Sequence, residues 1–244
     1  MTRTKNESAT DIIVPVYNQY SFTRNLIESI YRYTDVPFHI YVIDNASTDE
    51  TVDLDKIYTR NITVVHNRKN LGWSAGINHG VGLGCNQNVV FMKNEVEVSS
   101  GWLRNLLGFL DTHPLIGAVG PLNSDPNDEH FIDKVRKLTV PQIPNFLTDD
   151  LHERNRILKY HFNRAGITTE GILALFCIVL KRRTFNEIGF LREVLGAGNE
   201  NEQYCLRLRE AGYVLGLSLD TYVAHHSSIA AKTIFESFAE TALH

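Results

Sequence analysis

The first half of the chain alternates short apolar runs, rich in β-branched residues, with longer segments whose apolar positions recur at helical spacing. Each short run ends in a proline or a polar loop, which predicts a buried strand. The expected strands lie in DIIVPVYN, FHIYVID, NITVVHN, NVVFMKN and IGAVGP, and the expected helices in 21–33, 74–84 and 101–114. Strands that alternate with helices indicate an α/β fold with a parallel sheet and helices on both of its faces.

Polar clusters follow four of these strands. The clusters are Tyr17–Asn18, Asp44–Asp49, Asn67–Trp73 and Lys93–Glu97. In open parallel sheets, ligands bind outside the carboxyl ends of the strands. We therefore expect the four polar loops to converge on one crevice at that edge of the sheet.

The second half of the chain has a different pattern, and residues 121–160 are polar and without a clear period. A buried strand that leads into a helix is predicted in ILALFCIVLKRRTFNEIGF, and a helix in NENEQYCLRLREAGY. One or two short strands are expected in YVLGLSLDTYVAHH, and a helix in the amphipathic tail. No linker is visible, so we expect a single domain of residues 1–244, divided into 1–120, 121–228 and a C-terminal helix at 229–244.

Composition excludes several classes of protein. Of 244 residues, 43% are apolar and 21% are charged, which excludes a disordered chain, a collagen and a coiled coil. The net charge of −4 lacks the basic excess of a nucleic-acid-binding protein. Three distant cysteines fit neither a disulfide scaffold nor a zinc site. With no signal peptide and no apolar run long enough for a transmembrane segment, we expect a cytoplasmic protein.

Two acidic pairs are the candidates for chemistry. Glu95 and Glu97 are two residues apart on an extended segment, so their carboxylates point the same way. Such oxygen ligands suit Mg²⁺ or Mn²⁺, which can hold a diphosphate, although a solvated strand face is the simpler explanation. Glu200 and Glu202 lie in the first turn of a predicted helix. Their role is either structural, because the helix dipole favours acidic residues there, or catalytic, as a general base.

Further candidates follow other predicted strands. His225 comes after the last strand and is either structural or a metal ligand. Tyr17 and Asp44 can stack on a planar base and accept its N–H, but Asp44 also fits an Asx turn. Gly72 and Ala75 are small enough to let a ligand approach the backbone. The glycine motifs of dinucleotide-binding and P-loop proteins are missing from the sequence.

The order of these motifs resembles the family 2 inverting glycosyltransferases over residues 10–228. The resemblance rests on VPVYNQ, VIDNASTDET, NRKNLGWSAGINHG, FMKNEVEVSSGWL, LKRRTFNEIGF, GNENEQYCLRLREAGY and VAHH. It implies a GT-A fold, a Rossmann-like and mostly parallel central sheet flanked by helices, with a smaller acceptor-side half. It also implies that a sugar passes from a nucleotide-diphospho-sugar donor to a glycan or lipid-linked acceptor, as in polysaccharide biosynthesis.

The resemblance assigns roles to individual residues. Residues 1–120 would bind the donor, with the acceptor selected within 121–170. Residues implied along the nucleotide and diphosphate are Pro15, Tyr17, Asp44, Asn70, Gly72, Trp73, Ala75, Asn78, Lys93, Asn94 and Glu95. A Mn²⁺ or Mg²⁺ ion would contact Glu95, Glu97 and His225.

The chain departs from the family pattern at the catalytic base. Asn201 stands where the family has its catalytic Asp, and Gln203 where it has a second Asp. An amide cannot accept the proton of a sugar hydroxyl, so Glu202 or Glu200 is expected to replace the base, although one residue on a helix is a rotation of about 100°. The alternative is a catalytically weakened module that binds nucleotide-sugar or glycan, or supports an active partner. A homo-oligomer and a module of a longer polypeptide are both compatible with the chain.

Overall fold

The structure, a computed structural model, describes all residues except 1–8, 129, 139–145, 147, 194–198 and 227–244. The helix predicted at 229–244 therefore lies outside the described residues. No helix in the described part of the chain has the length and apolar character needed to cross a bilayer. The expected cytoplasmic location stays a prediction.

The four strands predicted first in the sequence form one parallel block. They are β1 (Thr10–Val16), β2 (Phe38–Asp44), β3 (Ile62–His66) and β4 (Asn88–Met92). Their order in the sheet is β3-β2-β1-β4, and every neighbouring pair is parallel. The carboxyl ends of all four strands therefore meet at one edge of the sheet, which we call the carboxyl edge.

The sheet continues from β4 with strands of both directions. These are β5 (Val96–Glu97), β6 (Ile116–Asn123), β7 (Gly166–Thr169), β8 (Cys177–Lys181) and β9 (Val214–His225). β8 is antiparallel to β4 and to β6, so β6 and its parallel neighbour β9 run in the same direction as β4. β5 and β7 pair antiparallel with β9. This confirms the expected α/β fold with a mostly parallel sheet, in which the antiparallel strands are β5, β7 and β8.

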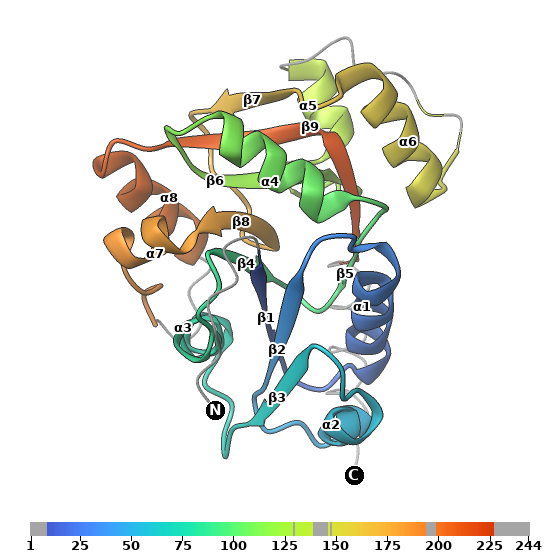
Figure 1. The fold of residues 1–244 in the computed structure, drawn as a ribbon, viewed down its shortest axis with the longest axis vertical. Helices are drawn as coiled ribbons and strands as arrows, with labels where there is room; N and C mark the ends of the chain where they lie inside the picture. Colours follow the sequence, from blue (N-terminus) through green and yellow to red (C-terminus); the bar gives the residue numbers. More distant parts are fainter. Residues whose placement is uncertain (1–8, 129, 139–145, 147, 194–198, 227–244) are drawn as a thin grey trace.

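Helices cover both faces of the sheet (Figure 1). They are α1 (Tyr20–Tyr33), a 3₁₀ helix η1 (Glu50–Asp53), α2 (Leu54–Ile57), α3 (Trp73–Leu83), α4 (Trp102–Thr112), α5 (Ile132–Leu138), α6 (Leu151–Phe162), α7 (Arg182–Ile188) and α8 (Glu200–Glu210). Alternate residues of β1 show why both faces are covered, because Ile12 and Val14 pack with α1 and α4 whereas Ile13 packs with α3, α7 and α8.

The region 121–160, predicted to be irregular, contains α5 and α6 instead. Asp150 caps α6 by accepting a hydrogen bond from the backbone N–H of Glu153 at 2.7 Å. Only Leu158 and Asn155 of α6 are buried, and the side chain of Asn155 bonds the backbone of Ser100 and Tyr222. A helix that buries so few apolar residues leaves a weak periodic signal in the sequence.

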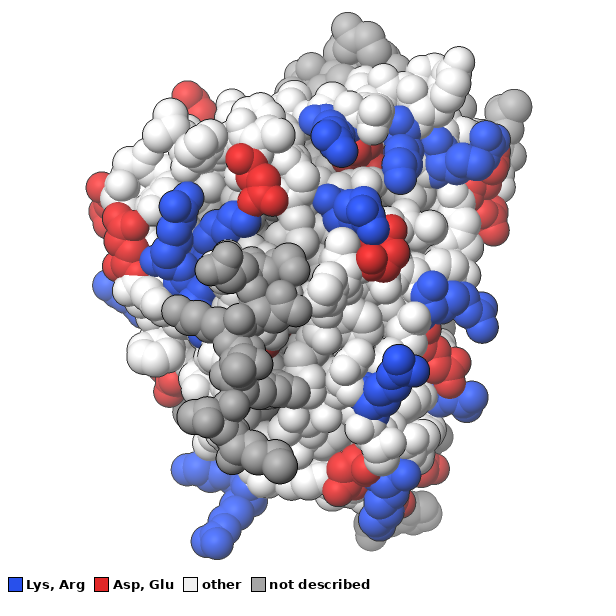
Figure 2. Space-filling view, in the orientation of Figure 1, with Lys and Arg blue, Asp and Glu red and all other residues white. Residues whose placement is uncertain are grey.

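The described surface carries charges of both signs. On the face shown in Figure 2, Lys and Arg are interspersed with Asp and Glu. Several pairs are ion pairs within one element, such as Arg24–Glu28 on α1 and Arg156–Glu153 on α6. This mixture fits the small net charge of −4.

A buried ion pair joins β1 to the first residue of α7, at the edge of the sheet where β1 and β4 begin. Asp11 is fully buried and accepts hydrogen bonds from Arg182 at 2.7 Å and from the Asn86 backbone N–H at 2.9 Å.

We expect Asp11→Ala to lower the free energy of unfolding by about 3–5 kcal/mol, because the buried guanidinium loses its counter-charge. Urea unfolding measures this. Asp35→Ala, which removes the exposed Arg104 pair, is the control and should cost about 1 kcal/mol or less. Equal losses in the two variants would contradict the prediction.

Candidate functional site

The sheet brings six strand ends to the carboxyl edge. β1, β2, β3, β4, β6 and β9 run in one direction, so the loops that follow them lie at the same edge. The four polar clusters predicted from the sequence follow β1 to β4. The loop after β6 and the end of β9 add further polar residues. These loops form the candidate site.

The loop after β1 is fastened to the loop after β2. The Asn18 backbone N–H donates to Ser47 Oγ at 2.7 Å, and Asn18 Oδ1 accepts from the Thr48 N–H at 2.7 Å. Asn18 and Gln19 have φ values of 55° and 62°, a left-handed conformation that asparagine tolerates better than most residues. The loop therefore has a defined shape, and beside it the ring of Tyr17 is 46% exposed and available for stacking.

Asp44 is buried and its carboxylate is engaged by the protein. Oδ1 accepts from the Ser47 backbone N–H at 2.9 Å, which is the Asx turn that we weighed as its alternative role. Oδ2 lies 2.8 Å from Nδ1 of His66, at the end of β3. His66 was missed by the sequence analysis. Its signal was its position, because it is the last residue of a predicted strand and precedes a polar loop.

The loop between β3 and α3 is fixed by amide side chains. Asn45 donates to the Gly72 carbonyl at 3.2 Å and accepts from Asn67 at 3.0 Å. Asn70 accepts from the Gly72 N–H at 2.8 Å, and Gly72 has a φ of 83°, which favours glycine. Asn70 is exposed, whereas Gly72, Trp73 and Ala75 are partly buried at the start of α3.

Pro15 and Asn78 have internal contacts. A Cβ on Gly76 of α3 would lie 2.6 Å from Cβ of Pro15, so Pro15 sits directly beneath α3. The side chain of Asn78 bonds the backbone N–H and carbonyl of Leu191, both at 2.9 Å, and the Glu193 carboxylate at 2.9 Å. Asn78 therefore fastens α3 to the segment that follows α7. A contact of Asn78 with a nucleotide stays a prediction.

Glu95 and His225 come together although 130 positions separate them in the sequence. Glu95 Oε1 lies 3.7 Å from Nε2 of His225 and 3.9 Å from Nζ of Lys93. Burial acts to raise the pKa of the Glu95 carboxyl. The adjacent imidazole and ammonium outweigh burial, so the pKa is lowered from its ordinary value. Lys93 and Glu95 thus form a long salt-bridge contact.

The other residues of the predicted signature face elsewhere. Glu97 is half-exposed, and its carboxylate lies 4.0 Å from Nε2 of His226 rather than beside His225. The Asn94 amide is buried and donates to Thr23 of α1 at 3.2 Å. Among the described residues, no group of three or more His, Cys, Asp or Glu side chains already has the arrangement of a metal site.

The loop after β6 brings two carboxylates that the sequence analysis missed. Asp125 Oδ2 and Asp128 Oδ2 lie 3.6 Å and 3.8 Å from Nδ1 of His225. Both aspartates lie in the sequence PLNSDPND, directly after a predicted strand. The same rule that identified the first four polar clusters applied to this loop as well.

The two candidate bases lie in the first turn of α8. Glu200 is partly buried, whereas Glu202 is exposed. The helix packs through Tyr204, Cys205 and Leu208, and at about 100° per residue Glu200 lies closer to this packed face than Glu202 does. Neither carboxylate has a hydrogen bond or ion pair with another residue that the structure describes.

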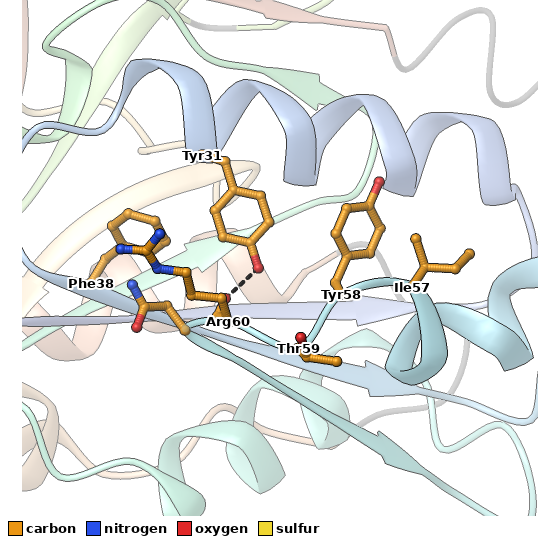
Figure 3. Close-up of a pocket in the computed structure, with 7 residues that line it drawn as sticks. Tyr31, Phe38, Ile57, Tyr58, Thr59 and Arg60 are labelled. Atoms are coloured by element: carbon orange, nitrogen blue, oxygen red, sulfur yellow. Dashed lines mark hydrogen bonds between the residues drawn. The ribbon is translucent and has the colours of Figure 1, made fainter.

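The pocket in Figure 3 lies at the opposite edge of the sheet. Tyr31, Phe38, Ile57, Tyr58, Thr59, Arg60 and Asn61 line it, where β2 and β3 begin. Two further cavities, of about 490 and 520 Å³, lie at that same opposite edge, around Gln87 before β4 and Lys181 at the end of the antiparallel β8. None of the three is lined by a residue of the candidate site, which is formed by loops and side chains at the carboxyl edge.

Comparison with known families and proteins gives a consistent result. The family described as Glycosyl transferase family 2 matches residues 11–189. An N-acetylglucosaminyl-diphospho-decaprenol L-rhamnosyltransferase of Mycobacterium tuberculosis is 23% identical over 241 residues, 89% of this chain and 76% of the relative. An uncharacterized glycosyltransferase of Haemophilus influenzae is 29% identical over 115 residues, 45% of this chain and 35% of the relative.

Solved structures share the fold at low sequence identity. The mannosyltransferase PcManGT from Pyrobaculum calidifontis, solved with GDP-Man and Mn²⁺, has a TM-score of 0.65 and 18% identity. GalNAc-T7, solved with UDP, GalNAc and Mn²⁺, has a TM-score of 0.67 and 16% identity. The alignments cover 90% and 91% of this chain but 57% and 44% of those chains. The chain thus spans about half the length of these two structures.

Proposed function

The chain belongs to glycosyl transferase family 2, and from this membership we propose that it transfers a sugar from a nucleoside-diphosphate donor to a hydroxyl group of an acceptor. The fold has the loops after β1, β2 and β3 at the same edge of the sheet as the Glu95–His225 pair. That convergence is the observation that carries the proposal.

The donor's nucleoside would bind over the loops after β1, β2 and β3. Tyr17 is exposed for stacking on the base, and Asp44 and His66 form a polar pair at the end of β2 and β3. Asn70, Gly72, Trp73 and Ala75 line the approach to the amino end of α3, where backbone N–H groups favour a negatively charged group. Lys93 adds a positive charge near the diphosphate.

A divalent cation is proposed beside Glu95. A cation would fit here because the His225 side chain is 4% exposed and neither of its ring nitrogens has a hydrogen bond among the described residues. A carboxylate and an imidazole are suitable ligands for Mn²⁺, and Mg²⁺ would favour the carboxylate. Glu95 and His225 would hold the ion, with Glu97 as the further ligand that the family signature implies. When bound, such an ion neutralises the charge of a leaving diphosphate.

The protein's own part in the reaction would be to orient two substrates and to accept a proton. In an inverting transfer, the acceptor oxygen bonds to the anomeric carbon while the bond from that carbon to the diphosphate oxygen breaks. The acceptor's hydroxyl proton passes to a carboxylate, for which Glu200 or Glu202 is available in place of Asn201.

The acceptor is proposed to be a glycan or a lipid-linked sugar. The mycobacterial relative is named for a diphospho-decaprenol acceptor. α6 packs against β9, and the loop that carries Asp125 faces His225 at the end of the same strand. Both acceptor classes present a hydroxyl group, so the chemistry of the site is compatible with either.

A second function has one observation in its favour. Asn201 and Gln203 are amides where the family has carboxylates. A module that binds a nucleotide-sugar or a glycan without turnover would tolerate these amides. The two functions differ in turnover, not in binding.

Calorimetry with UDP, GDP and TDP, each with and without Mn²⁺ or Mg²⁺, tests the proposal. We expect one nucleoside diphosphate to bind, and removal of the metal by EDTA to weaken that binding at least tenfold, about 1.4 kcal/mol. The corresponding nucleoside monophosphate is the control and should show little metal dependence, because it lacks the β-phosphate. Transfer or donor hydrolysis across the matching nucleotide-sugars supports the enzyme. Binding without turnover supports the second function, and binding of no nucleoside diphosphate contradicts the proposed transfer.

A further inference from the structure

The imidazole of His225 lies between carboxylates on both of its nitrogens. Nε2 is 3.7 Å from Glu95 Oε1, whereas Nδ1 is 3.6 Å from Asp125 Oδ2 and 3.8 Å from Asp128 Oδ2. The His225 side chain is 4% exposed, and neither nitrogen makes a hydrogen bond within the described residues. A buried polar side chain is normally hydrogen-bonded, so this arrangement needs an explanation.

The loop after β6 is built to present its carboxylates to the imidazole. Asp125 Oδ1 accepts from the Asn127 backbone N–H at 3.0 Å, and Asp128 Oδ1 accepts from the His130 backbone N–H at 2.7 Å. In both aspartates the second oxygen, Oδ2, is the one that faces Nδ1. The loop is also fastened to β9, because Ser124 Oγ accepts from the His225 backbone N–H at 3.0 Å.

Phe176 restricts the plane of the imidazole but not its orientation within that plane. The two rings are stacked, with centroids 4.5 Å apart and an angle of 15° between their planes. A half-turn of the imidazole about its bond to Cβ would keep the stacking and exchange Nδ1 with a carbon. Only polar neighbours can decide between the two orientations.

We propose that Asp125 and Asp128 are positioning residues that hold the His225 imidazole with Nδ1–H toward their carboxylates, so that Nε2 is the nitrogen on the Glu95 side and is available to a cation there. A neutral imidazole has one N–H donor and one lone pair, and ionised carboxylates only accept. A shortening of about 0.7 Å brings Nδ1 and Asp125 Oδ2 to a normal hydrogen-bond distance of about 2.9 Å. This proposal rests on the proposed function in one respect, namely that the cation binds on the Glu95 side. Carboxylate partners of this kind orient metal-binding histidines in many proteins.

The double variant Asp125→Asn and Asp128→Asn tests the proposal. In each asparagine the carbonyl oxygen can keep the Oδ1 contact with the loop backbone, and the amide NH₂ then faces Nδ1. A donor replaces an acceptor, so we expect the His225 proton to move to Nε2. Nitrogen-15 NMR of the metal-free protein, at a pH where the ring carries one proton, distinguishes the two tautomers. A proton on Nε2 in the wild-type protein, or the same tautomer in both proteins, would overturn the proposal.

Mn²⁺ affinity provides the second measurement. Calorimetry should give an affinity about 10- to 100-fold lower for the double variant than for the wild-type protein. Asp133→Asn on α5 is the matched control, because it removes one nearby carboxylate that pairs with Arg136 and does not face His225. Equal Mn²⁺ affinities in the wild-type protein and the double variant would overturn the proposal. Absence of Mn²⁺ binding to the wild-type protein would contradict the cation in the proposed function, whereas the tautomer measurement needs no metal.

Discussion

Glu95→Gln is expected to lower the rate of sugar transfer by about 10²- to 10³-fold, the cost of removing one group that stabilises charge in a transition state. The carboxylate is largely buried and lies between His225 and Lys93. Burial opposes its charge, but the two basic neighbours lower its pKa, so Glu95 is ionised at neutral pH. Glutamine has nearly the same shape and lacks that charge, so it removes the proposed cation ligand and leaves the packing in place.

Initial rates at saturating donor, over a range of Mn²⁺ concentrations, measure the effect. We expect the Glu95→Gln variant to need a far higher Mn²⁺ concentration to reach half of its maximal transfer rate. Its transfer rate at saturating Mn²⁺ should still be low. Glu28→Gln on α1 is the matched control, because Glu28 is half-exposed, pairs with Arg24 and is not part of the candidate site. An unchanged transfer rate in Glu95→Gln would remove Glu95 from the proposed reaction.

The combined variant Glu200→Gln and Glu202→Gln is expected to lower transfer by about 10²- to 10⁴-fold, the contribution of a general base. In the proposed reaction the expected position of the family's base is occupied by Asn201, so a neighbouring carboxylate would accept the proton. Glu200 is partly buried near the packed face of α8, whereas Glu202 is exposed. We therefore expect most of the loss in the single Glu200→Gln variant.

Steady-state kinetics distinguish this role from a role in binding. A missing base lowers kcat and leaves the affinity for the nucleoside diphosphate unchanged. Glu210→Gln at the other end of the same helix is the control, since Glu210 is exposed and lies about two and a half turns away. Unchanged rates in both single variants and in the double variant would mean that neither glutamate is the base.

Local sequence patterns were sufficient for the parallel block. The runs IIVPV and IYVI are apolar at every position because β1 and β2 are covered by helices on both faces. A continuous apolar run of that length followed by a polar loop is a local property of the sequence. The predicted carboxyl edge followed from it, because parallel strands end on the same side.

The same local reasoning was insufficient for α6. Its sequence LHERNRILKYHF buries one leucine and one asparagine, so the apolar period is almost lost. The helix depends on its Asp150 cap and on contacts of Asn155 with Ser100 and Tyr222. Such contacts are invisible in a window of neighbouring residues, and the prediction of irregular structure was therefore wrong.

The sequence by itself determined the strands of the parallel block, their shared carboxyl edge and the polar character of the loops there. The hydrophobic periods that mark strands and helices can be read within short segments of the chain. Only the tertiary structure decided which of those polar side chains meet. It brought Glu95 and Asp125 each within 4 Å of the His225 imidazole, and it placed the Glu97 carboxylate 4.0 Å from His226. Side-chain partners across a sheet depend on strand order and register, which are set by packing of the whole chain rather than by any local segment.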